Sequence, residues 1–140
     1  MNKIIVASHG GLAGGLLDAA RLIVGTTEDV FAFGLMPEEK PEDFKERLYK
    51  EIDSDPDRGV LVLLDILCGT PFNSVIEKLR QSNVQVVIGV NLPMLLESIL
   101  HQGDELEALS AYVEETGHQG ITSKHALMEK LKKKEGRDER

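Results

Sequence analysis

A histidine at the end of a short apolar run has the clearest capacity for chemistry in this chain. Residues 4–7 are Ile, Ile, Val and Ala, and Ser8, His9, Gly10 and Gly11 follow directly. The pattern indicates a buried strand with an imidazole at its carboxyl end, where open α/β sheets hold their reactive groups. An imidazole can act as an uncharged nucleophile or as a proton carrier near neutral pH. We therefore expect His9 to carry the reaction.

A carboxylate, Asp65, stands near the end of the most hydrophobic run of the sequence, residues 59–67. If the strands that carry the two residues are neighbours, His9 and Asp65 face one crevice at the carboxyl edge of the sheet. The carboxylate would then accept the Nδ1 proton of His9, fix the tautomer and leave the Nε2 lone pair facing outward. The alternative is that Asp65 caps the loop that follows its strand.

Two expected helix starts would lie beside this pair. The helix after Gly10 adds positive potential, which disfavours the imidazolium and keeps the nucleophile neutral. Thr70 and the proline after it are typical of an N-cap and a first helical residue, and the N–H groups there are suited to phosphoryl oxygens. Ser8, Gly10 and Asn91 complete the candidate phosphate-binding or supporting residues, although helix capping remains open for Thr70 and is favoured for Asn91. The assembly is suited to placing a phosphoryl group on His9 Nε2.

Apolar segments alternate regularly with amphipathic segments along the chain. The pattern predicts strands over residues 4–7, 30–36, 59–67 and 84–90. It predicts helices over residues 12–24, 41–52, 70–80, 93–101 and 105–115. Strands that alternate with helices indicate a mostly parallel sheet with right-handed crossovers. We expect a three-layer α/β fold, with a four-stranded sheet in the order 2-1-3-4 and helices on both faces.

Composition excludes several classes of protein. The chain has 140 residues, a net charge of −8 and a pI near 5.0, which fit one globular domain and argue against nucleic acid or an anionic membrane as partner. A partner with a basic docking patch remains compatible with this charge. No apolar run approaches the roughly 20 residues of a membrane span, and no signal peptide is recognisable. We expect a cytoplasmic protein.

Other reactive side chains give weaker signals. The single cysteine, Cys68, excludes an internal disulfide and is expected to be a semi-buried apolar residue rather than a nucleophile. His101, His118 and His125 lack metal-ligand spacing. We therefore expect neither a metal nor a bound cofactor.

The chain lacks residues that three other classes of phosphate-binding or phosphoryl-transfer protein require. The glycine-rich segment 10–15 has Leu12 at the middle glycine position of G-x-G-x-x-G, and no Lys-Ser/Thr of a P-loop follows. A receiver domain needs acidic magnesium ligands after the first strand, where Ser8 and His9 stand. A histidine phosphatase or phosphomutase has an arginine at the position of Ser8. These absences favour a phosphoryl acceptor histidine without a nucleotide.

Three motifs resemble the IIA component of mannose-class sugar phosphotransferase systems. They are Ser8-His9-Gly10, Leu64-Asp65 followed by Gly69-Thr70-Pro71-Phe72-Asn73, and Gly89-Val90-Asn91-Leu92-Pro93-Met94-Leu95. The resemblance covers about residues 1–125 and leaves residues 126–140 as a charged tail, which we expect to be a frayed, solvated end. It implies a phosphotransferase with a phosphohistidine intermediate, without cofactor or metal. His9 would accept phosphate from the phosphocarrier HPr and pass it to a separate IIB subunit, while Asp65 orients the ring and Thr70 lies near the phosphoryl group.

The same resemblance implies an assembly. Members of the family are homodimers that exchange a short C-terminal strand, for which residues 120–123 are the candidate here. The membrane components IIC and IID would be contacted only indirectly, and the transported sugar is not specified by this subunit. Two alternatives stay open: the phosphocarrier subunit of a dihydroxyacetone kinase, whose loops differ from the second and third motifs, and a non-catalytic, phospho-regulated signalling module.

Overall fold

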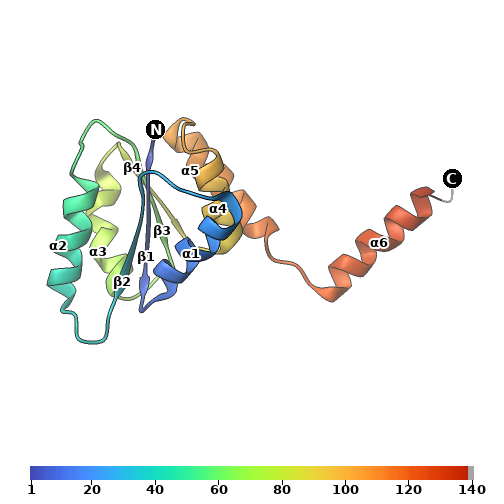
Figure 1. The fold of residues 1–140 in the computed structure, drawn as a ribbon, viewed down its shortest axis with the longest axis horizontal. Coiled ribbons are helices and arrows are strands. Elements are labelled where there is room, and N and C mark those ends of the chain that lie inside the picture. Colours follow the sequence, from blue (N-terminus) through green and yellow to red (C-terminus); the bar gives the residue numbers. More distant parts are fainter. Residues whose placement is uncertain (139–140) are drawn as a thin grey trace.

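The computed structural model describes residues 1–138 and shows a parallel sheet between two layers of helices (Figure 1). The strands are β1 (Lys3–His9), β2 (Val30–Leu35), β3 (Val60–Leu64) and β4 (Val84–Ile88). The helices are α1 (Leu12–Val24), α2 (Pro41–Ile52), α3 (Thr70–Val75), the 3₁₀ helix η1 (Ile76–Arg80), α4 (Leu92–Leu100), α5 (Leu106–Gln119) and α6 (Lys124–Asp138). The strands are all parallel in the order β2-β1-β3-β4, which confirms the predicted fold class and strand order.

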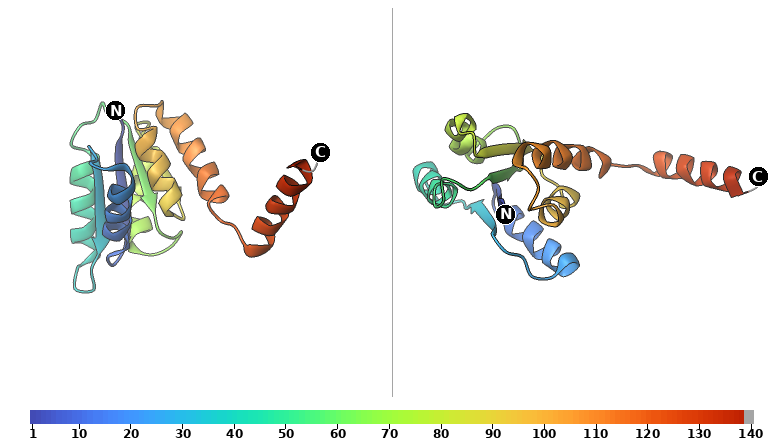
Figure 2. Two further views of the ribbon diagram at one scale, coloured as in Figure 1. Left: turned by 45° about the vertical axis from the view of Figure 1, so that its right-hand side comes forward. Right: turned by 90° about the horizontal axis from the view of Figure 1, so that it is seen from above.

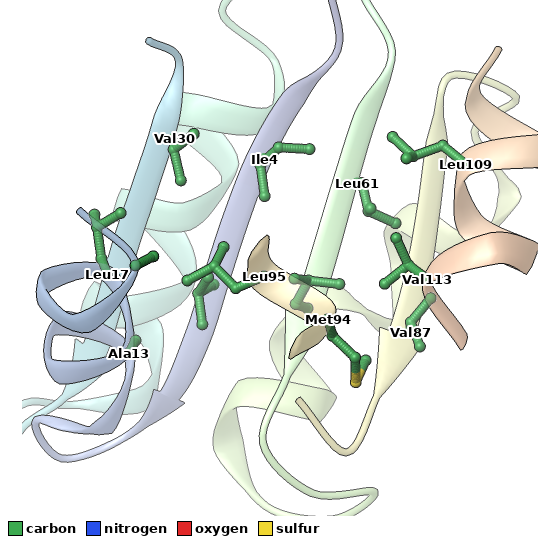
Figure 3. Close-up of a cluster of buried hydrophobic side chains, with 13 residues drawn as sticks. Ile4, Ala13, Leu17, Val30, Leu61, Val87, Met94, Leu95, Leu109 and Val113 are labelled. Carbon is green, nitrogen blue, oxygen red and sulfur yellow. The ribbon is translucent and has the colours of Figure 1, made fainter. Parts of the chain in front are cut away.

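The sheet separates two hydrophobic clusters. Helices α1, α4 and α5 cover one face, and α2 with α3 and η1 covers the other (Figures 1 and 2). All five residues of β3 are fully buried, because their side chains alternate between the two clusters. Leu61 of β3 lies in the first cluster with Leu95 of α4 and Val113 of α5 (Figure 3). Burial of each large aliphatic side chain contributes about 1.5–3 kcal/mol, so the central strands are held firmly from both sides.

The sheet order places two loops side by side. The register pairs Ala7 of β1 with Leu64 of β3, so that the residues after each strand emerge together at the carboxyl edge. The strand order also reverses here, because β2 lies on one side of β1 and β3 on the other. Ligand and reaction sites of open α/β sheets lie at this switch point. His9 and Asp65 occupy it.

Several predicted boundaries are wrong at the carboxyl edge. The hydrophobic run continues to Leu67, but β3 ends at Leu64, and Ile66, Leu67 and Cys68 are exposed in the loop that follows. Hydrophobic periodicity alone does not distinguish a buried strand from an apolar loop that continues the same run of residues. Strand β4 likewise ends at Ile88, two residues earlier than predicted.

The helix predicted over residues 70–80 divides after Val75 into α3 and η1. Its tighter second part turns Lys78 toward α2, where Nζ binds the Asp53 carboxylate at 2.7 and 2.9 Å. Helix α5 extends four residues beyond the predicted end at residue 115.

The C-terminal region also differs from expectation. The frayed end predicted for residues 126–140 is wrong as far as residue 138, because these residues belong to α6, which projects away from the rest of the chain (Figures 1 and 2). Lys, Leu and Glu are good helix formers, which explains the helix. Within the described residues, 120–123 link α5 to α6 and form no strand, so strand exchange stays a prediction. No helix in residues 1–138 is long and apolar enough to cross a membrane.

Candidate functional site

The core of the site is a contact between the ring of His9 and the carboxylate of Asp65. His9 Nδ1 lies 2.7 Å from Asp65 Oδ2, which is the contact expected from the two strand ends. The His9 side chain is 45% exposed, whereas the Asp65 side chain is only 9% exposed. The ring therefore stands at the surface with a buried carboxylate behind it.

Asp65 is held by three hydrogen bonds. The backbone N–H of His9 donates to Oδ2 at 2.9 Å, beside the ring contact, and the N–H of Ile66 donates to Oδ1 at 2.9 Å. Burial opposes ionisation, but the hydrogen bonds from His9 and Ile66 outweigh it and lower the pKa of Asp65 below its usual value. The carboxylate is therefore ionised near neutral pH and fixed in one orientation.

This arrangement defines the ring tautomer. An ionised carboxylate only accepts hydrogen bonds, so Nδ1 must carry the proton that it shares with Asp65. In the neutral ring the lone pair therefore lies on Nε2, and the side chain as a whole is 45% exposed. A neutral histidine with an oriented, accessible Nε2 is equipped for nucleophilic attack.

Ser8 and Gly10 support the turn between β1 and α1. Ser8 is fully buried, and its Oγ accepts the N–H of Ala13 in the first turn of α1 at 2.8 Å. The N–H of Gly10 donates to the carbonyl oxygen of Leu35 at 2.8 Å, which ties the turn to the end of β2. Neither contact involves the ring, so both residues stabilise the segment that presents His9.

Gly69 is a site residue that the sequence motif contained but residue chemistry did not single out. Its φ is +98°, and a Cβ built on it would lie 2.6 Å from His9 Nε2 and 2.8 Å from Cε1. The loop after β3 thus folds back against the reactive side of the ring. Only glycine combines this backbone conformation with such an approach.

We expect Gly69→Ala to reduce strongly the phosphoryl acceptance that the sequence predicts for His9, because the new methyl group displaces Nε2. Gly25→Ala is the matched control, since Gly25 also has a positive φ of +85° but nothing lies within 4 Å of its built Cβ. Both variants carry backbone strain of about 1–3 kcal/mol, measurable by thermal unfolding. Only Gly69→Ala should also lose acceptor activity in a phosphorylation assay, and equal losses in both variants would contradict this role.

Thr70 and Asn91 have different surroundings. The predicted N-cap role of Thr70 is wrong, because the left-handed turn at Gly69 makes Gly69 the N-cap and starts α3 at Thr70. Thr70 lines a surface hollow of about 360 Å³ between α2 and α3. Asn91 caps α4, since its Oδ1 accepts the N–H of Met94 at 3.1 Å, and its Nδ2 donates to the carbonyl oxygen of Gly117 at 3.0 Å. The hydrogen bonds of Asn91 therefore tie it to α4 and α5.

Exposed apolar side chains flank the histidine. Leu12 begins α1, Met36 follows β2, and Ile66 and Leu67 follow β3, so all four lie in segments at the carboxyl edge of the sheet. Apolar side chains exposed together around a reactive group are typical of a surface that docks another protein. Among residues 1–138, no group of three or more His, Cys, Asp or Glu side chains is arranged to hold a metal ion.

The fold and the site together define an α/β protein with an aspartate-oriented histidine at the switch point of its sheet. A family described as PTS system fructose IIA component matches residues 3–116. The chain therefore belongs to this family, the mannose-class IIA components of sugar phosphotransferase systems. Such components act as phosphotransferases in general.

Individual relatives agree with this assignment. The chain is 33% identical over 125 residues to the PTS system mannose-specific EIIAB component of Escherichia coli, a match that covers 84% of this chain but only 38% of that protein's length. It is 30% identical over 103 residues to the sorbose-specific EIIA component of Klebsiella pneumoniae, with 73% and 76% of the two chains covered. A solved phosphotransferase system EIIA component from Streptococcus agalactiae has a TM-score of 0.80 at 30% identity, covering 88% of this chain and 97% of its own.

Proposed function

We propose that this chain is the phosphoryl-carrier subunit of a sugar phosphotransferase system, which accepts phosphate from phospho-HPr on His9 and passes it to a separate IIB subunit. The observation that carries this proposal is the 2.7 Å contact between His9 Nδ1 and Asp65, which leaves Nε2 free on an exposed ring. Family membership supports the same role.

The transfer requires few groups. The Nε2 lone pair attacks the phosphorus as the bond from phosphorus to the donor breaks, and the Nδ1 proton stays on the ring against Asp65. The carboxylate stabilises the positive charge that the ring gains while the N–P bond forms. Catalysis of this kind depends mainly on positioning and electrostatics. In the second transfer, a nucleophile of the IIB subunit attacks the phosphorus, and Nε2 leaves with its lone pair.

Donor and acceptor would dock on the same surface. The four exposed apolar side chains at the same edge of the sheet as His9 offer a contact area that would lose water when a partner docks, and the net charge of −8 favours a partner with a basic face. Because the apolar side chains come from the segments after β1, β2 and β3, a partner seated on them would cover His9.

The proposal is tested with phosphoenolpyruvate, enzyme I and HPr. The chain should gain one acid-labile phosphoryl group and lose it again when a IIB subunit is added. A dihydroxyacetone kinase subunit would gain the group but not pass it to IIB, and a signalling module would retain it. Labelling by a sugar phosphate without enzyme I and HPr would instead indicate phosphomutase chemistry.

We further propose a homodimer in which residues 120–123 pair with the sheet of a second copy. Strand β4 is an edge strand in the described chain, and a groove of about 370 Å³ runs beside it, lined by residues that include Gly89, Met94 and Ile121. An unpaired edge with an adjacent groove is suited to an added strand, whose backbone hydrogen bonds compensate for its short length.

A chain that ends at Gln119 should therefore be monomeric, or dimerise more weakly than the full chain. This truncation keeps α5 complete but removes the proposed exchange segment together with α6. A chain that ends at Ser123 is the control, because it lacks α6 but keeps residues 120–123. Light scattering coupled to size-exclusion chromatography measures the outcome over a range of concentrations. Equal dimer stability in the truncated and the full chain would contradict strand exchange.

A further inference from the structure

Helix α6 has an apolar face with no covering layer in the described chain. Leu127 and Leu131 are 50% and 52% exposed, lie four residues apart and so share one face, and exposed Met128 adjoins them. The helix has 15 residues and stands apart from the sheet and its helices (Figure 2). An isolated helix of this length is marginal in water, so a covering surface would stabilise it considerably.

The charge of this region is opposite to that of the rest of the chain. Residues 124–140 contain seven Lys or Arg and four Asp or Glu, which gives a net charge of +3. Since the whole chain has a net charge of −8, residues 1–123 carry −11. By helical spacing, Lys130 and Lys134 lie next to Leu127 and Leu131, Lys132 lies next to Met128, and Lys133 lies on the opposite side of the helix. The helix therefore combines apolar contact with a basic border.

The outer surface of α4 and α5 has the complementary composition. Leu100 is 63% exposed, and Tyr112 is exposed and donates its hydroxyl to Glu97 at 2.9 Å. The pKa of Tyr112 is raised, mainly by this hydrogen bond to Glu97. Burial and the negative charges of Glu97, Glu115 and Asp104 add smaller contributions in the same direction. The surface thus joins two exposed apolar side chains to three carboxylates, two of which, Glu97 and Asp104, also lie 3.4 and 3.3 Å from the ring of His101.

A different apolar surface fits α6 less well. Ile76 and Leu79 of η1 are also exposed, but the same short helix carries Lys78 and Arg80. Lys78 is buried and already paired with Asp53, but Arg80 is an exposed cation that would repel the lysines bordering the apolar face of α6.

We propose that α6 of one chain docks on the α4–α5 surface of a second copy, with Leu127 and Leu131 against Leu100 and Tyr112. Lys130 and Lys134 then face Glu97, Asp104 and Glu115 of the other copy. The proposal rests on the pairing of two copies under the proposed function, and it adds a second contact beyond residues 120–123. Lipid is a less suitable occupant, because α6 has no aromatic residue and the remaining charge of −11 is repelled by an anionic surface.

The first test is the dimer dissociation constant of the full chain and of a chain that ends at Ser123. The shorter chain keeps the exchange segment and loses only α6 and the residues after it, so we expect dissociation to increase about tenfold or more. Leu127→Ser with Leu131→Ser should give a similar change. If the chain ending at Ser123 dimerises as tightly as the full chain, docking of α6 is wrong while strand exchange and phosphoryl transfer still stand.

The second test exchanges charges. Lys130→Glu with Lys134→Glu should weaken the dimer, and combining this pair with Glu97→Lys and Glu115→Lys should restore it. Lys133→Glu alone is the matched control for Lys134→Glu alone, because it makes the same change in net charge on the other side of the helix. Equal weakening by Lys133→Glu and Lys134→Glu, or no restoration, would overturn the proposal. A second result would also overturn it: the chain sediments with phosphatidylserine-containing vesicles, this binding requires Leu127 and Leu131, and replacement of the two leucines leaves the dimer unchanged.

Discussion

His9→Ala should reduce phosphorylation by phospho-HPr to background. The substitution removes the only ring that the structure places against Asp65, and with it the Nε2 lone pair that would form the N–P bond. The fold should persist, because the side chain lies at the end of β1 and the backbone N–H that donates to Asp65 remains. Acid-labile incorporation of phosphate from labelled phosphoenolpyruvate measures the result.

His125→Ala provides the control for this prediction. His125 is an exposed histidine on α6, away from the carboxyl edge of the sheet, and its loss should leave incorporation unchanged (Figure 1). Circular dichroism and thermal unfolding should show that both variants are folded. Normal labelling of His9→Ala would end the proposed function, whichever other residue then carried the phosphate.

Asp65→Ala should slow phosphoryl transfer by roughly 10²–10⁴-fold, the usual contribution of groups that orient or assist a reacting side chain. Without the carboxylate, Nδ1 loses its acceptor, and the ring is free to rotate and to place its proton on Nε2. The free energy of unfolding should also fall by about 1–3 kcal/mol, because the backbone N–H groups of His9 and Ile66 lose a charged hydrogen-bond acceptor.

Asp65→Asn tests the negative charge of the carboxylate while the volume of the side chain stays the same. The amide fills the same space, but its NH₂ group can donate to Nδ1, which moves the ring proton to Nε2 and blocks the nucleophile. We expect Asn to slow transfer as much as Ala does while preserving more of the stability. Rapid-quench kinetics measure the transfer, and nitrogen NMR of the His9 ring reports the tautomer. A near-normal rate in Asp65→Asn would show that the negative charge is dispensable.

The positions of His9 and Asp65 followed from the sequence because parallel strands fix where their ends meet. Each residue closes a strongly apolar run, and the adjacency of β1 and β3 brings the two ends together. The approach of Gly69 to Nε2 could not be predicted in this way. It depends on a positive φ and on the path of a loop, neither of which leaves a periodic signal in the residues.

The exposed loop after β3 and the helix at the C-terminus also could not be predicted from the pattern of residue types. Ile66 and Leu67 continue an apolar run, and only the structure shows that they are exposed at the site. The charge of the C-terminal tail predicts a frayed, solvated end, although its Lys, Leu and Glu residues favour a helix. In both cases the residues have the composition of a core or of a solvated end, so their composition alone does not indicate an exposed apolar surface.

One oxygen of Asp65 binds both the ring of His9 and the peptide N–H of the same residue. The backbone amide of His9 is therefore an internal sensor of the electronic state of the ring. When the imidazole gains charge, Asp65 Oδ2 binds the ring more strongly and accepts the hydrogen bond from the His9 peptide N–H less strongly. The NMR chemical shift of this peptide proton, and the rate at which it exchanges with solvent, should change as a result. Occupancy of the ring by phosphate can thus be followed at a main-chain position, in real time and without a labelled donor.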